Sequence, residues 1–172
     1  LSYTNNCEVD GTFIDDNTGL MWECKTSPGP SIHYIDNVYT WTDSVDNETD
    51  PDGTLFTVFL DTLNNRCDGD EATQCTSDAD CTRIGNELCG HAGHRDWRVP
   101  TVKELVGIID YSGIYPAKPY SVPSIYQGFL WSSTTFGQDL KSAWGVGFQI
   151  APGPSFRSKN VPSHVSAVRG AP

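Results

Sequence analysis

The sequence predicts an α+β fold in which two helices pack on short antiparallel strands, rich in loops and cross-linked by disulfides. Sixteen Gly and eleven Pro among 172 residues favour frequent turns over a helical bundle. Hydrophobic residues make up 37% of the chain and aromatic residues 11%, which is enough to build a core. A chain of this length is typical of one domain, so we assign residues 1–172 to a single unit.

The cysteines indicate an oxidising compartment. All six lie within residues 1–90, and none forms a CxxC or CxxCH motif, which disfavours zinc and covalent haem. A secreted protein whose signal peptide has been removed accounts for the cysteines and for the missing leader before Leu1. Many pairings are open, among them a Cys7–Cys24 bridge. We predict that all six are disulfide-bonded: Cys7, Cys24, Cys67, Cys75, Cys81 and Cys89.

Charge is distributed unevenly along the chain, whose net charge is −11. Residues 1–90 carry three Lys or Arg against eighteen Asp or Glu, whereas residues 91–172 carry eight against four. An acidic chain disfavours nucleic acid and anionic membranes as partners, because both need a patch of cations. No run of about 18 apolar residues is present, so we expect no membrane insertion.

The N-terminal part predicts a hairpin followed by a loop. Thr12 to Ile14 and Leu20 to Trp22 flank the turn from Asp15 to Gly19. Residues 25–53 predict mostly loop around the aromatic segment from Tyr39 to Trp41.

Two segments predict helices. From Thr54 to Asn65, apolar residues recur at spacings of three and four: Leu55, Phe56, Phe59, Leu60 and Leu63. The second helix begins at Thr101, where Glu104 completes a capping box, and we expect it to end at Tyr111 to Gly113. Leu105, Ile108 and Ile109 share its apolar face.

Residues 67–89 form an acidic, cysteine-rich insertion with almost no apolar content. Because such a segment has no core of its own, we predict a loop held at the surface by at least two cysteine pairs. From Phe129 to Arg169, short apolar runs alternate with Gly, Pro and Ser turns, which predicts antiparallel strands.

Four motifs resemble one bacterial family. They are G-H-R-D-W-R-V-P-T at 93–101 with Glu104 and Leu105, T-G-L-M-W at 18–22, W-S-S-T at 131–134 and V-R-G at 168–170. In order and spacing they are similar to the C-terminal domain of the Legionella collagen-like adhesin, over most of the chain.

The resemblance implies a C-type-lectin-like fold, related to sulfatase-modifying-factor domains, in a secreted or cell-surface protein. It also implies a binding or adhesion module for glycan or an extracellular surface protein, because the adhesin that names the family binds sulfated polysaccharide. Two features depart from the family. Ala167 stands where a cysteine often precedes V-R-G, and residues 67–89 are extra. The net charge of −11 also opposes long-range attraction of sulfated ligands.

The late loops are the candidate ligand surface, because in this fold the corresponding loops form the ligand face. We expect Trp144 to stack on a ligand. The polar contacts would come from Asp139, Lys141, Gln149, Arg157 and Lys159. The alternative is an ordinary loop surface without a ligand.

Other aromatic and charged motif residues have a structural explanation, because aromatic side chains dominate cores and charged neighbours pair or cap. We assign this role to Trp22, Asp96, Trp97, Arg98, Thr101, Glu104, Trp131 and Arg169.

Calcium is the one cofactor that the sequence suggests. Glu48, Asp50 and Asp52 alternate before Gly53, like the start of a calcium loop, but Phe59 stands where an EF-hand needs Glu. An irregular calcium site and a solvated acidic loop both remain open, and the same holds for Asp68, Asp70, Asp78 and Asp80. His91 and His94 lack a credible set of further zinc ligands.

Catalytic motifs are not found. The sequence has no GxSxG, GxGxxG or HExxH, and residues 90–172 lack the cysteines that sulfatase-modifying enzymes use. We therefore expect a binding protein. One alternative is a structural subunit of an extracellular filament or other assembly, in which the acidic half of one copy meets the basic half of the next head to tail. A second alternative is an enzyme whose site these motifs do not reveal.

Overall fold

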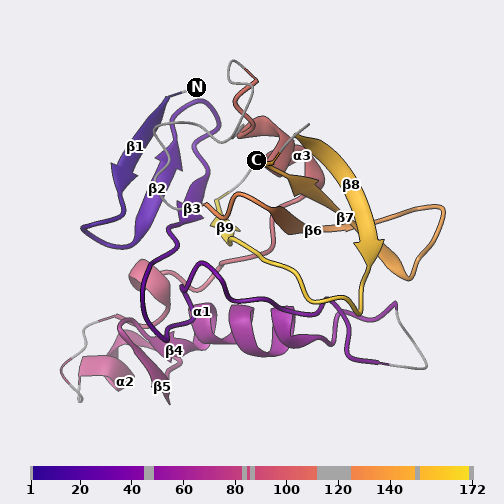
Figure 1. Cartoon of the computed structure of the whole chain (residues 1–172). Helices are drawn as coiled ribbons and strands as arrows, with labels where there is room; N and C mark the ends of the chain where they lie inside the picture. Colours follow the sequence, from indigo (N-terminus) through magenta and orange to yellow (C-terminus); the bar gives the residue numbers. More distant parts are fainter. Residues whose placement is uncertain are drawn as a thin grey trace.

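The computed structural model describes residues 2–44, 49–82, 85, 88–111, 125–149 and 152–170. Within these residues the chain forms three antiparallel sheets of four, three and two strands, together with short helices (Figure 1). The α+β prediction is confirmed at this level. No helix among the described residues is long and apolar enough to cross a membrane.

The four-stranded sheet joins the two ends of the chain. Its order is β1 (Tyr3–Asn6), β2 (Thr12–Asp15), β3 (Met21–Glu23) and β9 (Val168–Arg169). The predicted hairpin is present as β2 and β3, where Phe13 lies opposite Trp22 and Gly19 has a positive φ of 72° in the turn. The Cys7–Cys24 disulfide closes this unit. The sequence pattern did not predict β1.

The first predicted helix is present but changes type along its length. Residues Leu55–Leu60 form a π-helix, η1, and Asp61–Asn65 continue as the α-helix α1. Leu55, Phe59 and Leu63 are buried along its length, as the spacing predicted.

The second predicted helix, α3 (Val102–Gly107), is shorter than expected. Its capping box is present, with Thr101 accepting a hydrogen bond from the backbone N–H of Glu104. The prediction that it extends to Tyr111 is wrong, because the helix ends at Gly107, a residue that costs helix stability. Ile108 and Ile109 still reach the core from beyond its end.

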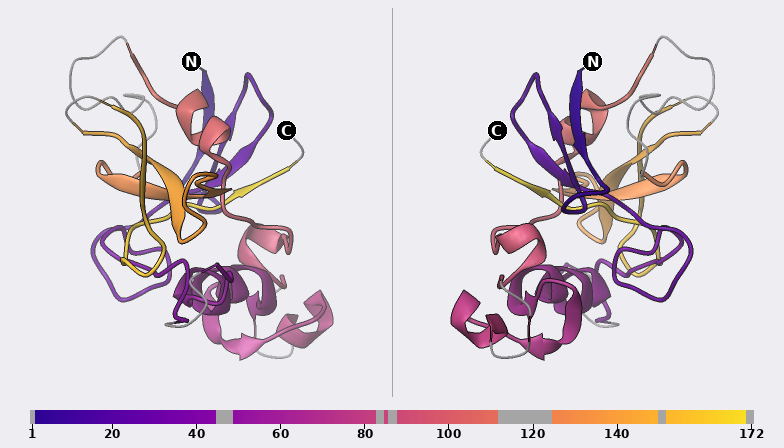
Figure 2. Two further views of the ribbon diagram at one scale, coloured as in Figure 1. Left: turned by 90° about the vertical axis from the view of Figure 1, so that its right-hand side faces the viewer. Right: turned by 90° about the vertical axis from the view of Figure 1, so that its left-hand side faces the viewer.

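Residues 66–82 and 88–90, which we call the cystine lobe, project from the rest of the molecule (Figures 1 and 2). The sequence predicted a cross-linked surface segment here without naming strands or helices in it. The lobe contains the hairpin β4 (Arg66–Cys67) and β5 (Asp70–Gln74) and the short helix α2 (Asp78–Thr82). The predicted internal cross-links are Cys67–Cys81 and Cys75–Cys89, and these four half-cystines form its buried cluster.

The three-stranded sheet carries the predicted late strands. Its order is β6 (Phe129–Thr135), β7 (Ser142–Gly147) and β8 (Gly153–Ser158), with β8 at one edge. On one face, Leu130 and Val146 pack with Leu105 of α3. On the other face, Phe129 and Trp131 belong to the cluster that contains the η1 side chains.

The segment from Tyr39 to Trp41, predicted as part of a loop, is tied into this second cluster. Both aromatic residues are buried, and the indole N–H of Trp131 donates to the carbonyl of Tyr39 at 3.1 Å. The indole N–H of Trp41 donates in turn to the carbonyl of Ser132 at 3.2 Å. The segment is therefore an irregular part of the core.

Candidate functional site

The predicted ligand residues lie on both faces of the three-stranded sheet. Side chains alternate between the faces of a strand, so directly paired residues share a face. Trp144 pairs with Phe156, and both share the face of Val146 that α3 covers. Arg157 pairs with Ala143 and lies on the opposite face. The structure therefore separates Trp144 from Arg157.

On the Arg157 face, a hollow of about 460 Å³ exists where two paired strand positions lack side chains. Gly147 of β7 lies opposite both Phe129 of β6 and Gly153 of β8. We call this the glycine hollow. Its lining also includes Gln149, Ser155 and Arg157, so it brings together two of the predicted ligand residues.

The hollow is open space rather than packed interior. A Cβ atom added to Gly147 or Gly153 would meet no heavy atom within 4 Å. At Gly145, two residues earlier on β7, the same atom would lie 2.3 Å from the carbonyl oxygen of Leu130 and from the Phe129 ring. The sheet surface is therefore filled at Gly145 and vacant at Gly147.

Polar groups border the glycine hollow. The Arg157 guanidinium lies 4.2 Å from the centre of the Phe129 ring, and its Nη1 donates to Ser163 Oγ at 3.2 Å. Gln149, Ser155 and Arg157 are all exposed. A stacked guanidinium keeps several N–H donors in a fixed plane, which suits recognition of hydroxyl or carboxylate oxygens.

The opposite face holds a groove of different chemistry. It measures about 320 Å³ and is lined by Val102, Val106, Trp144 and Pro154, with Lys103 at its border. We call it the apolar groove. Beside it, the rings of Phe136 and Phe156 stack with centres 4.1 Å apart, and both lie edge-on to the Trp144 ring.

Asp139 and Lys141 belong to the turn between β6 and β7. Asp139 is exposed, but its carboxylate accepts from Ser142 Oγ at 2.7 Å and from the Lys141 N–H at 3.1 Å. The hydrogen bond from Ser142, followed by that from Lys141, lowers the pKa of Asp139. Asp139 therefore holds the turn, and Lys141 is exposed beside it.

The prediction for Lys159 needs correction. Its side chain is 1% exposed, and its ammonium lies 3.9 Å from the centre of the Trp41 ring. It also donates to the carbonyl of Thr49 at 3.4 Å. The ammonium is therefore used inside the fold and does not face a ligand.

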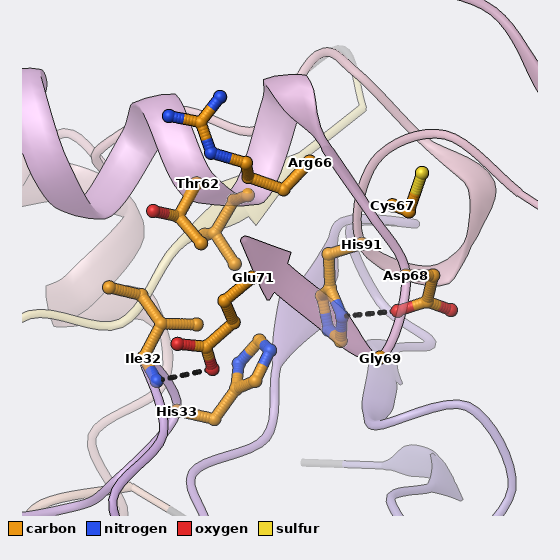
Figure 3. Close-up of a pocket in the computed structure, with 10 residues that line it drawn as sticks. Ile32, His33, Thr62, Arg66, Cys67, Asp68, Gly69, Glu71 and His91 are labelled. Carbon is orange, nitrogen blue, oxygen red and sulfur yellow. Dashed lines mark hydrogen bonds and ion pairs between the residues drawn. The ribbon is translucent and has the colours of Figure 1, made fainter. Parts of the chain in front are cut away.

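Apart from the glycine hollow and the apolar groove, a much smaller cavity lies where the cystine lobe meets the loop around His33 (Figure 3). It measures about 20 Å³, which is room for roughly one water molecule and far too little for a sugar ring. Glu71 accepts from the Ile32 N–H at 2.7 Å, and His91 Nδ1 lies 3.6 Å from Asp68. The rings of His33 and His91 are 4.3 Å apart. These contacts join the lobe to the rest of the fold.

Next to this cavity lies a buried ionic cluster that the sequence analysis missed. Glu23 is fully buried, and its Oε1 lies 2.8 Å from both Lys25 Nζ and His33 Nδ1. Burial by itself would raise the pKa of Glu23, but Lys25 and His33 outweigh it and lower the pKa to about 2. No sequence motif marks these residues, although a Glu and a Lys among strand hydrophobics were a usable signal.

The calcium candidates that the structure describes have different surroundings. Asp52 accepts from Thr42 Oγ1 at 2.6 Å and from the Asp43 N–H at 3.0 Å, whereas Glu48 lies outside the described residues and Asp50 is exposed. Within the described part, the one group of three ligand atoms near enough to share a metal comes from disulfide-bonded cysteines.

In the lobe, each carboxylate serves its own surroundings. Asp70 accepts from Thr73, Asp80 from Thr76 and Asp78 from the N–H of Cys89, while Asp68 faces His91.

The residues assigned structural roles are placed as follows. Trp22, Trp97 and Trp131 are buried. Arg98 forms a two-point contact with Glu104 at 2.9 and 2.6 Å.

The V-R-G motif at 168–170 is bonded to the motif at 93–101. Arg169 Nε donates to Asp96 Oδ1 at 2.7 Å, and its Nη2 donates to Oδ2 at 3.3 Å. The backbone of Arg98 also exchanges two hydrogen bonds with that of Val168, each 2.9 Å long.

The comparisons with known proteins single out one family. A family model described as the Lcl C-terminal domain matches residues 11–169, which includes the cystine lobe. Comparison with curated proteins gave no match, and neither did comparison with solved structures.

Proposed function

The chain belongs to the Lcl C-terminal domain family, and on that premise we propose that it is an extracellular module that binds glycan in the glycine hollow. The family is adhesin-associated, which matches the resemblance found in the sequence motifs. Three disulfides fit an extracellular location, because thiols in the cytosol are kept reduced. The proposed activity is binding without catalysis, and the architecture is proposed to be C-type-lectin-like.

The observation that carries the proposal is the vacancy at Gly147 and Gly153. A hollow of about 460 Å³ falls within the range of small-ligand sites, and its border offers Arg157, Gln149 and Ser155 as polar partners. Sugars need several such partners because each hydroxyl both donates and accepts. The apolar groove, with only Lys103 as a charged neighbour among its described lining residues, matches a sugar less well.

A glycan array tests the proposal. The labelled domain is applied to neutral and acidic oligosaccharides in calcium and in EDTA, which also shows whether binding requires calcium. Gly147→Ala places a methyl group in the hollow without touching protein atoms, so we expect it to reduce binding by about ten-fold or more. Arg157→Gln should reduce it similarly, because it removes a charged donor.

The matched control is Lys141→Gln, which removes an exposed positive charge from the turn outside the hollow. It should leave binding unchanged. The proposal is rejected if no saccharide binds in either buffer, or if Gly147→Ala and Lys141→Gln bind alike.

A further inference from the structure

One exposed hydrophobic side chain is held on a rigid acidic support. Val9 is 85% exposed at the turn between β1 and β2, and Glu8 and Asp10 flank it, both exposed. We call residues 7–11 the acidic turn. No other large hydrophobic side chain in the described part of the chain is as exposed as that of Val9.

The acidic turn is well ordered by its own bonds. The N–H groups of Val9 and Asp10 both donate to the carbonyl of Asn6, at 2.8 and 3.0 Å. Asp10 Oδ1 accepts from the N–H and the hydroxyl of Thr12, and Cys7 is bonded to Cys24. Little conformational entropy remains to be lost when such a turn enters a binding site.

The apolar groove has the complementary chemistry. Val102, Val106, Trp144 and Pro154 provide an apolar lining, and Lys103 is exposed at its border. A volume of about 320 Å³ accommodates an aliphatic side chain together with part of its turn. Lys103 would then face the carboxylates of Glu8 or Asp10, which commits the groove to an acidic, apolar occupant.

The two surfaces lie on different sides of the molecule. In Figure 1 the turn that connects β1 to β2 is at the left, whereas α3 and β8 lie right of centre. A turn that inserts into the groove of another copy leaves its own groove free for a third. Contacts of this heterologous kind build rings or open chains instead of closed two-fold dimers.

Most of the other charged side chains in the described part of residues 91–172 already have partners inside the fold. Arg98 pairs with Glu104, Arg169 pairs with Asp96, and Lys159 is buried. The acidic half and the basic half of the sequence therefore do not form two uniformly charged surfaces. Electrostatic attraction between copies has to come from individual exposed charges.

We propose that the acidic turn of one copy docks in the apolar groove of a second copy, with Val9 as the inserted side chain and Lys103 as the charged partner. Stable interfaces bury about 800 Å² on each partner, more than one turn covers. The association is therefore weak in dilute solution and grows with protein concentration.

Sedimentation velocity over a range of concentrations tests this self-association with the intact chain. The wild type should increase in mass with concentration, less so at high salt, because screening weakens the contacts of Lys103. Val9→Ser and Lys103→Glu should each lower the association constant about ten-fold or more. Both positions are exposed, so neither substitution should disturb folding.

Mixing the two variants gives the sharper result. Val9→Ser keeps an intact groove and Lys103→Glu keeps an intact acidic turn, so each stays monomeric alone while the mixture forms one-to-one dimers that grow no further. Val38→Ser, at a valine that is 48% exposed elsewhere, is the matched control and should associate like the wild type.

A wild type that stays monomeric at every concentration overturns the proposal, as does association that Val9→Ser and Lys103→Glu leave unchanged. A mixture that behaves as two monomers also overturns it. None of these three outcomes affects glycan binding in the glycine hollow, because that hollow lies on the other face of the sheet.

Discussion

Glu23 and Ala167, which lie 144 positions apart, are joined by two hydrogen bonds, and Ser166 forms a third with Glu23, so that the two ends of the domain are held together. The carboxylate of Glu23 accepts from the Ala167 N–H at 3.0 Å, the Glu23 N–H donates to the Ala167 carbonyl at 3.0 Å, and Ser166 Oγ donates to the Glu23 carbonyl at 3.1 Å. The resemblance to the family implies a cysteine at the position of Ala167. In this chain a buried carboxylate ties the same segment.

Replacing Glu23 by Gln should be strongly destabilising at neutral pH. The substitution leaves the buried Lys25 ammonium without its counter-charge, which typically costs about 3–5 kcal/mol. Denaturant unfolding at pH 7 measures the free energy of unfolding. Glu8→Gln, at an exposed acid, is the control and should change this free energy by less than about 0.5 kcal/mol.

The same carboxylate predicts how stability depends on pH. Its pKa in the fold is about 2, below the ordinary value of 4.5, so the unfolded chain binds this proton more readily. Its contribution is therefore complete above about pH 5 and is lost as pH falls towards 2. Between pH 5 and pH 2, the free energy of unfolding should therefore fall less steeply with pH for Glu23→Gln than for the wild type. Equal slopes would contradict the assignment.

Two glycines on one strand should respond oppositely to alanine. Gly145→Ala forces a methyl group against the Leu130 carbonyl and the Phe129 ring, so we expect a loss of about 1–3 kcal/mol. Gly147→Ala meets no neighbour and should be neutral or stabilise the strand by up to about 1 kcal/mol. Thermal unfolding compares the two variants directly, and similar melting temperatures would show that the hollow is not vacant.

The cystine lobe should unfold by itself when one of its two cross-links is removed. Each of its disulfides joins residues 14 positions apart, a loop for which a cross-link contributes about 3 kcal/mol, and the lobe's buried cluster consists of half-cystines. In the double variant Cys75→Ser with Cys89→Ser, amide hydrogen exchange should rise in residues 66–82. Protection of β6, β7 and β8 should persist, and its loss would mean that lobe and sheets unfold as one unit.

The start of α3 offers a test of the capping box. Glu104 accepts from the Thr101 N–H at 2.7 Å, and Thr101 Oγ1 accepts from the Glu104 N–H at 3.3 Å. Thr101→Ala should therefore cost about 1 kcal/mol, whereas Thr101→Ser, which keeps the hydroxyl, should cost much less. Equal losses in chemical denaturation would show that the threonine methyl group matters rather than the cap.

Local features of the fold were predictable because their partners are close in sequence. The β2–β3 hairpin needs a short turn, the capping box needs two residues three positions apart, and the spacing of Leu55, Phe59 and Leu63 marks one helical face. The lobe's cross-links followed from a segment too polar to build a core. The resemblance to the Lcl family rested on motifs of the same local kind, and the family model confirms it.

Features that depend on distant contacts were not predictable. Lys159 was predicted to contact a ligand because it lies in the late loops. Only the fold brings the Trp41 ring beneath its ammonium. Whether Trp144 and Arg157 share a face depends on the register between β7 and β8, which no single strand reveals. The glycine hollow was not predictable for a related reason. Glycines at 147 and 153 are typical of turns, and only the pairing of β7 with β8 places them opposite each other.

One face of the three-stranded sheet packs against α3, whereas the other packs into the cluster that contains the η1 side chains and lacks side chains at Gly147 and Gly153. Because an added Cβ atom at Gly147 or Gly153 meets no neighbouring atom, a methyl group can be placed at either position without repacking the domain. The outline of that surface can thus diverge between relatives one substitution at a time, while the motifs that maintain the scaffold stay the same.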